Sequence, residues 1–289
     1  MAGETITSRD NKWLKSFRAA LHGSGPREDD PIGIEGRKLV EDSVASGLEV
    51  RALLVSESAE RDLICVLEVA GRSEEGIPRS RIFRTTDKLF AGVSGTETPQ
   101  GVAALIRQPL WGLEDTFHGR AGRDRAFHVT TFPLIVVLTA IQDPGNVGTI
   151  IRSAEAFGAT GAIATRGTAD PWSPKALRAS AGSALRLPVL RGLAVPVVLA
   201  QLRISGAKII AAGAHESAKL IDWTLLRESL SGPAAIFVGS EGAGLPAEVE
   251  HTADARIAIP MNEPVESLNA GVAASILLYE AAKLRSGGA

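Results

Sequence analysis

The sequence predicts an α/β protein with two domains: a C-terminal domain built on a parallel sheet and a smaller N-terminal α/β domain. Apolar β-branched runs alternate with helical patterns along most of the 289 residues, as in strands joined by crossover helices. An irregular stretch at 108–131 interrupts this alternation and divides the chain. Apolar residues make up 45% and charged residues 22%, a balance typical of a globular protein with a buried core.

Charge and cysteine content narrow the class of protein. The formal net charge is −2, so any surface for a polyanion has to be local. The single cysteine, Cys65, excludes an internal disulfide framework and fits a reducing compartment. Residues 1–10 are polar, and no apolar run approaches the ~18 residues of a membrane span. We therefore expect a cytoplasmic protein without a secretory signal.

The N-terminal domain is predicted over residues 1–107. Its elements are expected, in order, as a basic helix at 4–20, a loop at 21–31, a helix at 35–45, strand-like or buried segments at 50–56 and 63–69, a strand at 82–85, a helix at 87–93 and a closing strand at 102–107. Gly47 lies where a helix C-cap is expected.

The first helix has a basic stripe. Four cations recur at three-residue spacing: Arg9, Lys12, Lys15 and Arg18. The ordinary interpretation is the solvated face of an amphipathic helix. The functional interpretation is a surface that contacts phosphates, since such contacts are electrostatic and need no sequence code.

The second domain is predicted over residues 132–289, after a linker at 108–131. We expect strands at 133–139, 160–165, 207–212, 234–239 and 255–259, and helices at 147–157, 175–183, 195–204 and 267–284. This order indicates a parallel sheet with helical crossovers.

Three strand-end segments of this domain, 143–158, 238–246 and 259–273, carry polar residues that can do chemistry. A parallel sheet gathers such loops along one edge, where ligands bind, so we expect them to line one site. The polar side chains are Asn146, Arg152, Glu241, Ser267 and Asn269.

In the first segment, an Asp143-Pro-Gly turn precedes Asn146, which we expect to cap a helix. Arg152 follows less than two turns later among apolar neighbours, so we expect it to be partly desolvated. The alternative is a capped amphipathic helix with one snorkelling arginine.

The second segment, from Gly239 to Gly244, is neither the dinucleotide fingerprint G-x-G-x-x-G nor a P-loop. Its glycines allow close approach of the backbone to a ligand, and Glu241 would be costly there without a partner. In the third segment Ser267 is expected to open the final helix. Small residues such as Gly271 fit tight packing or a dimer seam, which does not explain the polar Asn269.

Together and in this order, the three segments resemble the motifs of the SpoU (TrmH-type) branch of the SPOUT RNA methyltransferases. The resemblance covers residues 132–284, and the segment 170–183 also matches the family pattern. Stretches at 6–11, 34–37 and 98–102 resemble the substrate-binding domain often fused to this enzyme.

The resemblance implies S-adenosylmethionine as methyl donor, held in a deep trefoil knot, and a ribose 2′-hydroxyl of RNA as acceptor, in a homodimer that uses the final helix. It assigns cofactor binding to Gly239, Ile259 and Leu268, and catalysis to Asn146, Arg152, Glu241, Ser267 and Asn269. Contacts with RNA are expected from Arg9, Lys12, Lys15, Arg18, Arg37, Lys175 and Arg178. Because arginine keeps its proton in proteins, we expect Arg152 to hold a phosphate and stabilise alkoxide charge rather than to act as a base.

Two departures from the family pattern flank the site. Glu263-Pro264 stands where a glycine is common, and Ala270-Gly271-Val272 stands where Val-Ser-Val is usual. Ribosomal RNA is the expected substrate; transfer RNA, and a non-catalytic RNA-binding factor on the same fold, are the alternatives. A nicotinamide-dependent dehydrogenase fits poorly without its fingerprint. The five histidines show no metal-binding spacing, so no metal is expected.

Overall fold

The computed structural model describes residues 4–23, 25–27, 29–71, 77, 81–119, 132–213, 223–240 and 242–286, without the side chains of 223–225. The chain divides into two compact units. Unit 1 is Met1–Leu110 with Trp172–Arg178, and unit 2 is Trp111–Pro171 with Ala179–Ala289. Within the described residues, no helix is long and apolar enough to cross a membrane.

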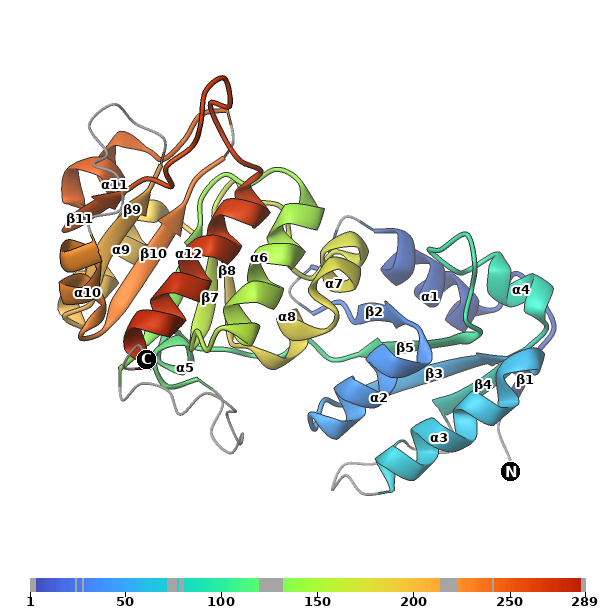
Figure 1. The fold of residues 1–289 in the computed structure, drawn as a ribbon. Helices are drawn as coiled ribbons and strands as arrows, with labels where there is room; N and C mark the ends of the chain where they lie inside the picture. Colours follow the sequence, from blue (N-terminus) through green and yellow to red (C-terminus); the bar gives the residue numbers. More distant parts are fainter. Residues whose placement is uncertain are drawn as a thin grey trace. The chain divides into compact units, whose positions relative to one another are not determined.

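Unit 1 is built on a mixed five-stranded sheet in the order β1-β4-β3-β5-β2 (Figure 1). Its strands are β1 (Glu4–Ile6), β2 (Ile32–Glu35), β3 (Val50–Ser56), β4 (Ile82–Thr85) and β5 (Val102–Ile106). β4 runs parallel to both β1 and β3, whereas β5 is antiparallel to β3 and β2.

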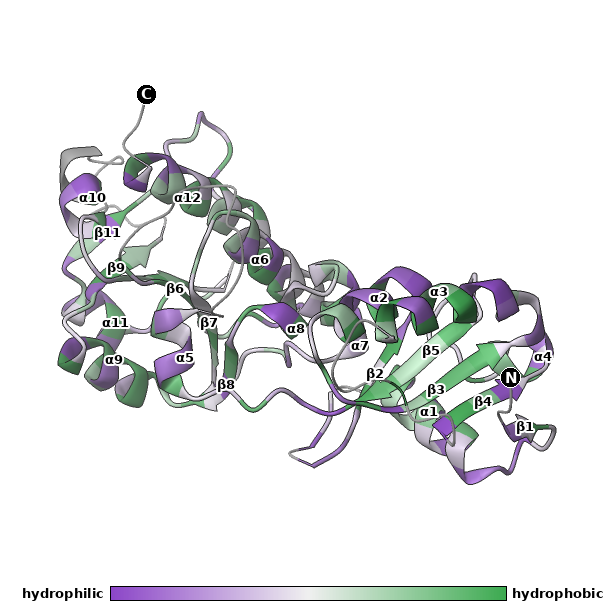
Figure 2. Ribbon diagram, turned by 90° about the horizontal axis from the view of Figure 1, so that it is seen from below, coloured by the Kyte–Doolittle hydropathy of each residue, from purple (hydrophilic) through white to green (hydrophobic). Residues whose placement is uncertain are grey.

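Helices cover both faces of this sheet. On one face α1 (Lys12–His22) and α4 (Asp87–Ala91) close a core that includes Phe17, Phe83 and Phe90. On the other lie α2 (Arg37–Ala45) and α3 (Glu60–Ala70), the latter preceded by the short helix η1 (Glu57–Ala59). Hydrophobic strands enclosed by helices with hydrophilic outer sides are visible in Figure 2.

Three expectations about the helices and strands of unit 1 were wrong. Residues 4–6 form a strand, and the first helix starts only after Asn11, whose side-chain oxygen accepts a hydrogen bond from the Trp13 amide at 2.8 Å. The second helix begins at Arg37, because 32–35 pair with β5. Residues 63–69 belong to a helix, because their buried apolar positions follow helical spacing.

Unit 2 is built on a six-stranded, all-parallel sheet in the order β11-β9-β10-β6-β7-β8. Its strands are β6 (Leu134–Leu138), β7 (Gly161–Thr165), β8 (Val189–Leu193), β9 (Lys208–Ala212), β10 (Ala234–Val238) and β11 (Ala255–Ile257). β6, β7 and β10 are buried along their whole length, as expected for parallel strands covered on both faces. The predicted α/β class with a parallel C-terminal sheet is confirmed.

The helices of unit 2 form a layer on each face (Figure 1). One layer contains α5 (Leu113–His118), α9 (Val195–Ile204) and α11 (Ala247–Thr252) and shares a core with the sheet. The other contains α6 (Pro144–Ala156) and α12 (Ala270–Arg285), which pack together, with α10 (Trp223–Leu230) against α12. The short helices α7 (Pro174–Ser180) and α8 (Ser183–Arg186) follow β7.

Several details differ from the expectations for this unit. Part of the predicted linker is the helix α5, while Arg120 to Thr131 lie outside the described residues. The helix expected at 175–183 is split into α7 and α8, because Ala181 and Gly182 have φ angles of 47° and 81°. The final helix begins at Ala270 rather than at Ser267. β8, α10 and α11 were not predicted.

Candidate cofactor and catalytic site

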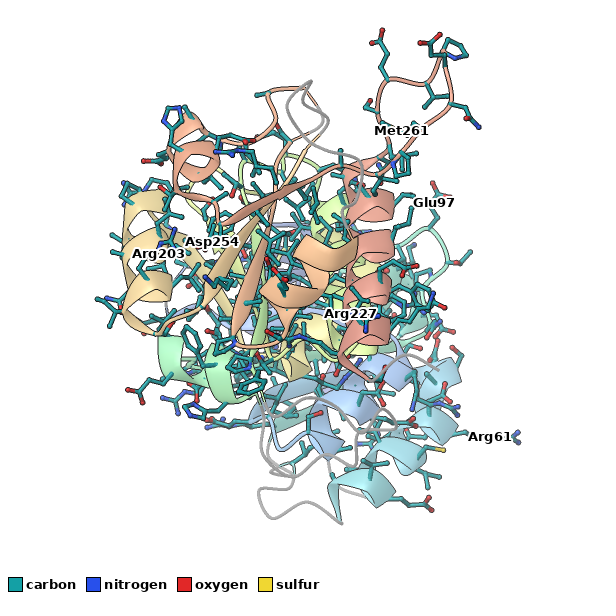
Figure 3. All side chains as sticks on the ribbon, turned by 60° about the vertical axis from the view of Figure 1, so that its left-hand side comes forward. Arg61, Glu97, Arg203, Arg227, Asp254 and Met261 are labelled. Atoms are coloured by element: carbon teal, nitrogen blue, oxygen red, sulfur yellow. The ribbon has the colours of Figure 1, made fainter. Side chains whose placement is uncertain are left out.

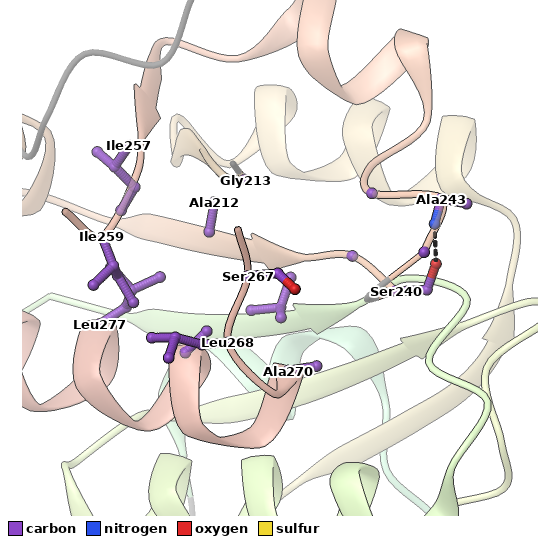
Figure 4. Close-up of a pocket in the computed structure, with 15 residues that line it drawn as sticks. Ala212, Gly213, Ser240, Ala243, Ile257, Ile259, Ser267, Leu268, Ala270 and Leu277 are labelled. Atoms are coloured by element: carbon purple, nitrogen blue, oxygen red, sulfur yellow. Dashed lines mark hydrogen bonds between the residues drawn. The ribbon is translucent and has the colours of Figure 1, made fainter. Parts of the chain in front are cut away.

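A cavity of about 260 Å³ lies at the carboxyl ends of β9, β10 and β11, beside the start of α12 (Figure 4). All three predicted cofactor-binding residues line it, although they come from separate segments of the chain. They are Gly239, Ile259 and Leu268. The predicted catalytic residue Ser267 lines it as well. The fold therefore brings the second and third segments together at one edge of the sheet, where ligands of parallel sheets bind.

The floor of the cavity is a tight glycine loop after β10. The Gly244 amide donates to the Ser240 carbonyl at 2.9 Å, and the Ala243 amide donates to the Ser240 hydroxyl at 3.2 Å. A Cβ on Gly239 would lie 2.3 Å from the Gly244 carbonyl oxygen. Gly239 is therefore required for the loop to close, and the backbone itself forms this wall of the cavity.

The other walls are mainly apolar. Side chains of Val238, Ile257, Ile259, Leu268 and Leu277 surround the space. Their polar complement consists of the Ser240 and Ser267 hydroxyls and backbone groups of the glycine loop. Apolar walls with a few fixed polar groups suit a flat heterocycle such as adenine, and the volume suits a nucleoside-sized group.

Two asparagines join the first segment to the third. The Asn269 side-chain nitrogen donates to the Asn146 side-chain oxygen at 3.0 Å. The oxygen of the Asn269 side chain accepts from the Gly271 and Val272 amides at 2.9 and 3.2 Å. Asn269 is thus the N-cap of α12 and simultaneously fixes Asn146 on α6, next to residues that line the cavity.

Asn146 is not the helix cap that the sequence predicted. α6 starts at Pro144, and the side chain of Asp143 accepts from the Gly145 amide at 3.0 Å. Proline is favoured at the first position of a helix because its missing N–H is not needed there. Asn146 is therefore the third residue of the helix, in its first turn, where its side chain meets that of Asn269.

Arg152 is exposed, so the predicted partial desolvation was wrong. Its apolar neighbours Ile150 and Ile151 are buried, whereas Arg152 lies on the outer side of α6. Within the described part of the chain Arg152 makes no hydrogen bond or ion pair. By contrast, Arg186 and Arg203 of the same unit are paired with Glu155 and Asp254 at 2.7 and 2.9 Å. The charge of Arg152 therefore remains available to a ligand.

Glu241, the remaining predicted catalytic residue, lies outside the described residues. Its neighbours Ser240 and Gly242 line the cavity. Its catalytic role stays a prediction.

Of the four cations of the predicted basic stripe, three lie on α1 and Arg9 precedes the helix; the three on α1 are only partly free. Lys15 pairs with Asp10 at 3.3 Å, and Lys12 lies 5.9 Å from the centre of the Trp13 ring. Arg18 donates to the Gly92 carbonyl at 3.0 Å, and Arg9 is exposed.

The other cations expected to contact RNA divide into two kinds. Arg37 contacts Glu41 and Asp62 at 3.4 and 3.3 Å, so its charge is largely balanced within unit 1. Lys175 and Arg178 are exposed on α7.

Sequence reasoning missed the seam between α6 and α12. The hydroxyls of Ser153 and Ser275 are 2.6 Å apart, and a Cβ on Gly271 would lie 3.1 Å from Thr149 Cγ2. The small residues of the last helix were noticed, but not their partner helix. Ala212 and Gly213, which line the cavity, were also missed; their place at the end of a predicted strand was the available signal.

Comparisons with known proteins agree with this geometry. The family model of the SpoU rRNA methylase family matches residues 133–279, and that of the MRM3-like substrate binding domain matches 27–104. The chain is 30% identical over 275 residues to the 23S rRNA (guanosine(2553)-2′-O)-methyltransferase RlmP of Bacillus subtilis, covering 95% of this chain and 97% of that protein. An uncharacterized tRNA/rRNA methyltransferase of Synechocystis is also 30% identical, over 96% of this chain and 93% of its own length.

Solved structures give the same result. An AdoMet-bound rRNA methyltransferase from Sinorhizobium meliloti superposes with a TM-score of 0.75 and 26% identity, covering 96% of this chain and 97% of that one. The SpoU methyltransferase AviRb from Streptomyces viridochromogenes, in complex with AdoMet, gives a TM-score of 0.74 and 27% identity, with 96% and 100% covered.

The chain belongs to the SpoU rRNA methylase family. It is an S-adenosylmethionine-dependent RNA methyltransferase that acts on a ribose 2′-hydroxyl, with an N-terminal substrate-binding domain. The apolar cavity and its glycine loop fit the cofactor, and membership of the family implies the trefoil knot.

Proposed function

We propose that the RNA is ribosomal RNA and that Asn146, Arg152, Ser267 and Asn269 act at the ribose. The observation that carries the residue assignment is the Asn269–Asn146 hydrogen bond, which joins α6 to the cavity loop. The substrate class is supported by the rRNA methyltransferases among the relatives and by the substrate-binding match in the N-terminal part. A cytoplasmic location fits such a substrate.

S-adenosylmethionine supplies a methyl group on a sulfonium, which an oxygen nucleophile attacks in line. The protein therefore has to position the ribose and to manage the charge on its oxygen. Arg152 lies on an exposed side of α6 and pairs with no other residue among those described, so it can bind the adjacent phosphate and stabilise the developing alkoxide. Because arginine keeps its proton, it acts as an electrostatic stabiliser and not as the base.

The two asparagines and Ser267 have positioning roles in this proposal. Asn269 is fixed as the cap of α12, so its amide holds Asn146 in one orientation. Asn146 then orients the ribose or the Arg152 side chain. Ser267 lines the cavity and orders its third segment against the cofactor.

We further propose a homodimer that uses α12. Val272 and Tyr279 are 48% and 51% exposed and lie two turns apart on this helix. The Tyr279 ring packs edge-on against Phe157, at the end of α6, at 5.6 Å. These exposed apolar side chains suit the self-complementary face of a twofold dimer. Sedimentation should show a dimer for the wild type and a monomer for Val272→Glu/Tyr279→Glu; a wild-type monomer would exclude this face.

The substrate assignment is tested by transfer of labelled methyl groups to total RNA from a strain that lacks this protein. The RNA is separated by size and digested to nucleosides. Label recovered from large ribosomal RNA as a 2′-O-methylnucleoside is the expected result. Label confined to transfer RNA would overturn the ribosomal assignment while keeping the reaction.

A further inference from the structure

A carboxylate of unit 1, far in sequence from the reactive residues, holds one loop in a fixed shape. Glu35, at the end of β2, accepts hydrogen bonds from the Ser94 and Thr96 hydroxyls at 2.6 and 2.9 Å and from the Gly95 amide at 3.0 Å. The Ser94 hydroxyl is also 3.1 Å from that of Thr96. Three donors from consecutive residues satisfy one carboxylate, so residues 94–96 are rigidly attached to the sheet.

The same loop is attached to α1 on its other side. Arg18 donates to the Gly92 carbonyl at 3.0 Å, and the His22 ring nitrogen lies 3.1 Å from the Val93 carbonyl oxygen. A Cβ on Gly95 would lie 2.7 Å from the Leu21 carbonyl oxygen, so only glycine permits this approach. The basic helix and the loop are therefore one rigid piece of unit 1.

Two glycines fix the far end of the loop. Gly101 has a φ of +77°, and a Cβ there would lie 2.4 Å from the Ser56 hydroxyl. Gly36 has a φ of +103°, and its missing side chain makes room for Gln100, whose Oε1 would lie 2.9 Å from a Cβ. A loop held at both ends in this manner presents its tip with a reduced entropic cost on binding.

The tip, residues 97–100, is exposed and polar. Glu97 points into solvent (Figure 3). Within the described residues, the Thr98 hydroxyl and the Gln100 amide have no hydrogen-bond partner. A hydroxyl and an amide supply donors and acceptors that match base edges. The Glu97 carboxylate disfavours a phosphate at the same place, and α1 offers cations for phosphates instead.

We propose that the loop 94–101 reads the base edges of unpaired nucleotides in the RNA substrate, while the basic face of α1 holds their phosphates. The proposal rests on the proposed function, since it takes RNA as the ligand of unit 1. Unpaired nucleotides are specified because the deep, narrow major groove of paired RNA does not admit side chains to base edges. Glu35 is a positioning residue for this contact.

The test measures dissociation constants for a panel of short single-stranded RNAs of different sequence, and for one duplex, at several salt concentrations. The loop variant is Thr98→Ala/Gln100→Ala, and the α1 variant is Lys12→Ala/Lys15→Ala. Gln201→Ala is the matched control, because Gln201 is an exposed glutamine of unit 2.

The loop variant should bind the preferred single strand about tenfold more weakly, with an unchanged duplex affinity and salt slope. The α1 variant should bind all RNAs more weakly and to the same extent. The slope of its binding constant against salt concentration, on logarithmic scales, should fall by about 2. Glu35→Gln should reproduce the loop phenotype without changing the affinity for S-adenosylmethionine, whose cavity is in unit 2.

The proposal would be overturned if the wild type bound all single-stranded RNAs equally well, or if the loop variant kept the sequence preference of the wild type. It would also be overturned if the loop variant lost both its affinity for the duplex and the salt dependence of binding. Methyl transfer to ribosomal RNA by the same wild-type preparation is measured in parallel. If that transfer is absent while the loop variant loses sequence preference, the ribosomal assignment fails and the base-reading loop stands.

Discussion

At the scale of single residues, the site depends on positions where one atom more or less changes the geometry. Gly239 and Asn269 are the clearest examples. Gly239 has no room for a side chain, and the Asn269 side chain bonds to Asn146 and to the Gly271 and Val272 amides. The roles assigned to both residues are structural rather than chemical. One shapes the cavity, and the other sets the orientation of Asn146.

Gly239→Ala should weaken cofactor binding without unfolding the protein. The added Cβ would lie 2.3 Å from the Gly244 oxygen, so the loop must open and the cavity must lose its floor. Calorimetry with S-adenosylmethionine should show affinity at least about tenfold weaker. Gly232→Ala is the control, because a Cβ there meets no atom within 4 Å and Gly232 does not line the cavity. Equal affinity in the two variants would contradict the assignment of the cavity.

Asn269→Ala should lower both stability and turnover. Loss of the α12 cap should cost about 1 kcal/mol. Loss of the bond to Asn146 should reduce kcat more than it changes the KM for the cofactor, because Asn146 then lacks the contact that orients it from α12. Thermal melts and single-turnover transfer measure the two effects. Asn262→Ala, at an exposed asparagine of the same segment, should leave both unchanged.

The resemblance named candidate polar residues for the site, but the sequence alone did not show their orientations. Arg152 was expected to be desolvated because its neighbours in sequence are apolar. Successive helical residues point about 100° apart, however, so Ile150 and Ile151 can be buried while Arg152 faces solvent. Asp143 and Asn146 are both good caps, and only the position of Pro144 at the start of the helix decides between them.

At the scale of elements, α12 connects the cofactor loop to the opposite end of the sheet. Its last turn contains Arg285, which donates to the carbonyls of Phe132, Pro133, Leu230 and Gly232 at 2.6–3.2 Å. Burial lowers the pKa of Arg285 to about 10, so the side chain stays charged at neutral pH. One guanidinium thus ties the end of α12 to the starts of β6 and β10.

Arg285→Met should destabilise the protein by about 2 kcal/mol or more, because carbonyls that now bind a cation lose their partner. Chemical denaturation measures this difference. Arg227→Met is the control, because Arg227 is exposed on α10. If Arg285→Met lowered the free energy of unfolding no more than the control does, the four carbonyls would be satisfied without Arg285.

Asp254 joins α9, β9 and β11 and should make unit 2 sensitive to acid. Burial raises the pKa of this carboxyl, but the Ile209 amide, Arg203 and Lys208 outweigh it and leave the pKa below its ordinary value of 3.8. The group therefore stabilises the fold above the unfolded pKa, and this contribution is lost as the pH falls through the folded value. The contact between Asp254 and Arg203 can be followed in Figure 3.

Melting temperatures should accordingly drop in the wild type below about pH 4. Asp254→Asn should have a lower melting temperature than the wild type at pH 7. Its melting temperature should fall less on acidification, because the variant has no carboxylate to protonate. The same acid dependence in both proteins would exclude Asp254 as a source of it.

Strands and helices with a regular pattern of buried residues were predicted more accurately than those without one. β6 and β10 are buried throughout and read as continuous apolar runs, so they were placed within a residue or so. Only Val189 of β8 is buried and Gly192 has a positive φ, so neither a continuous apolar run nor a clear alternation remains. Residues 63–69 were ambiguous because a short apolar run fits a strand and a helix equally well.

At the scale of the whole molecule, the two units divide the work of a methyltransferase. Unit 2 holds the cofactor cavity and the residues assigned to the ribose, while unit 1 presents the loop and the basic helix assigned to RNA. The alternation of strands and helices was predictable in outline, although β1, β2, β8, α10 and α11 were not predicted. The grouping of Trp172–Arg178 with unit 1 was not predictable, because it depends on contacts between residues distant in sequence.

The most direct test of the account compares cofactor affinity with single-turnover methyl transfer in Arg152→Ala and Arg152→Lys. Arg152 does not line the cavity, so both variants should bind S-adenosylmethionine as the wild type does. Transfer should fall at least about a hundredfold in Arg152→Ala and recover partly in Arg152→Lys, which keeps the charge but not the planar donor pair. Near-normal transfer by Arg152→Ala would contradict the assigned role of Arg152 and, with it, the placement of the ribose beside α6.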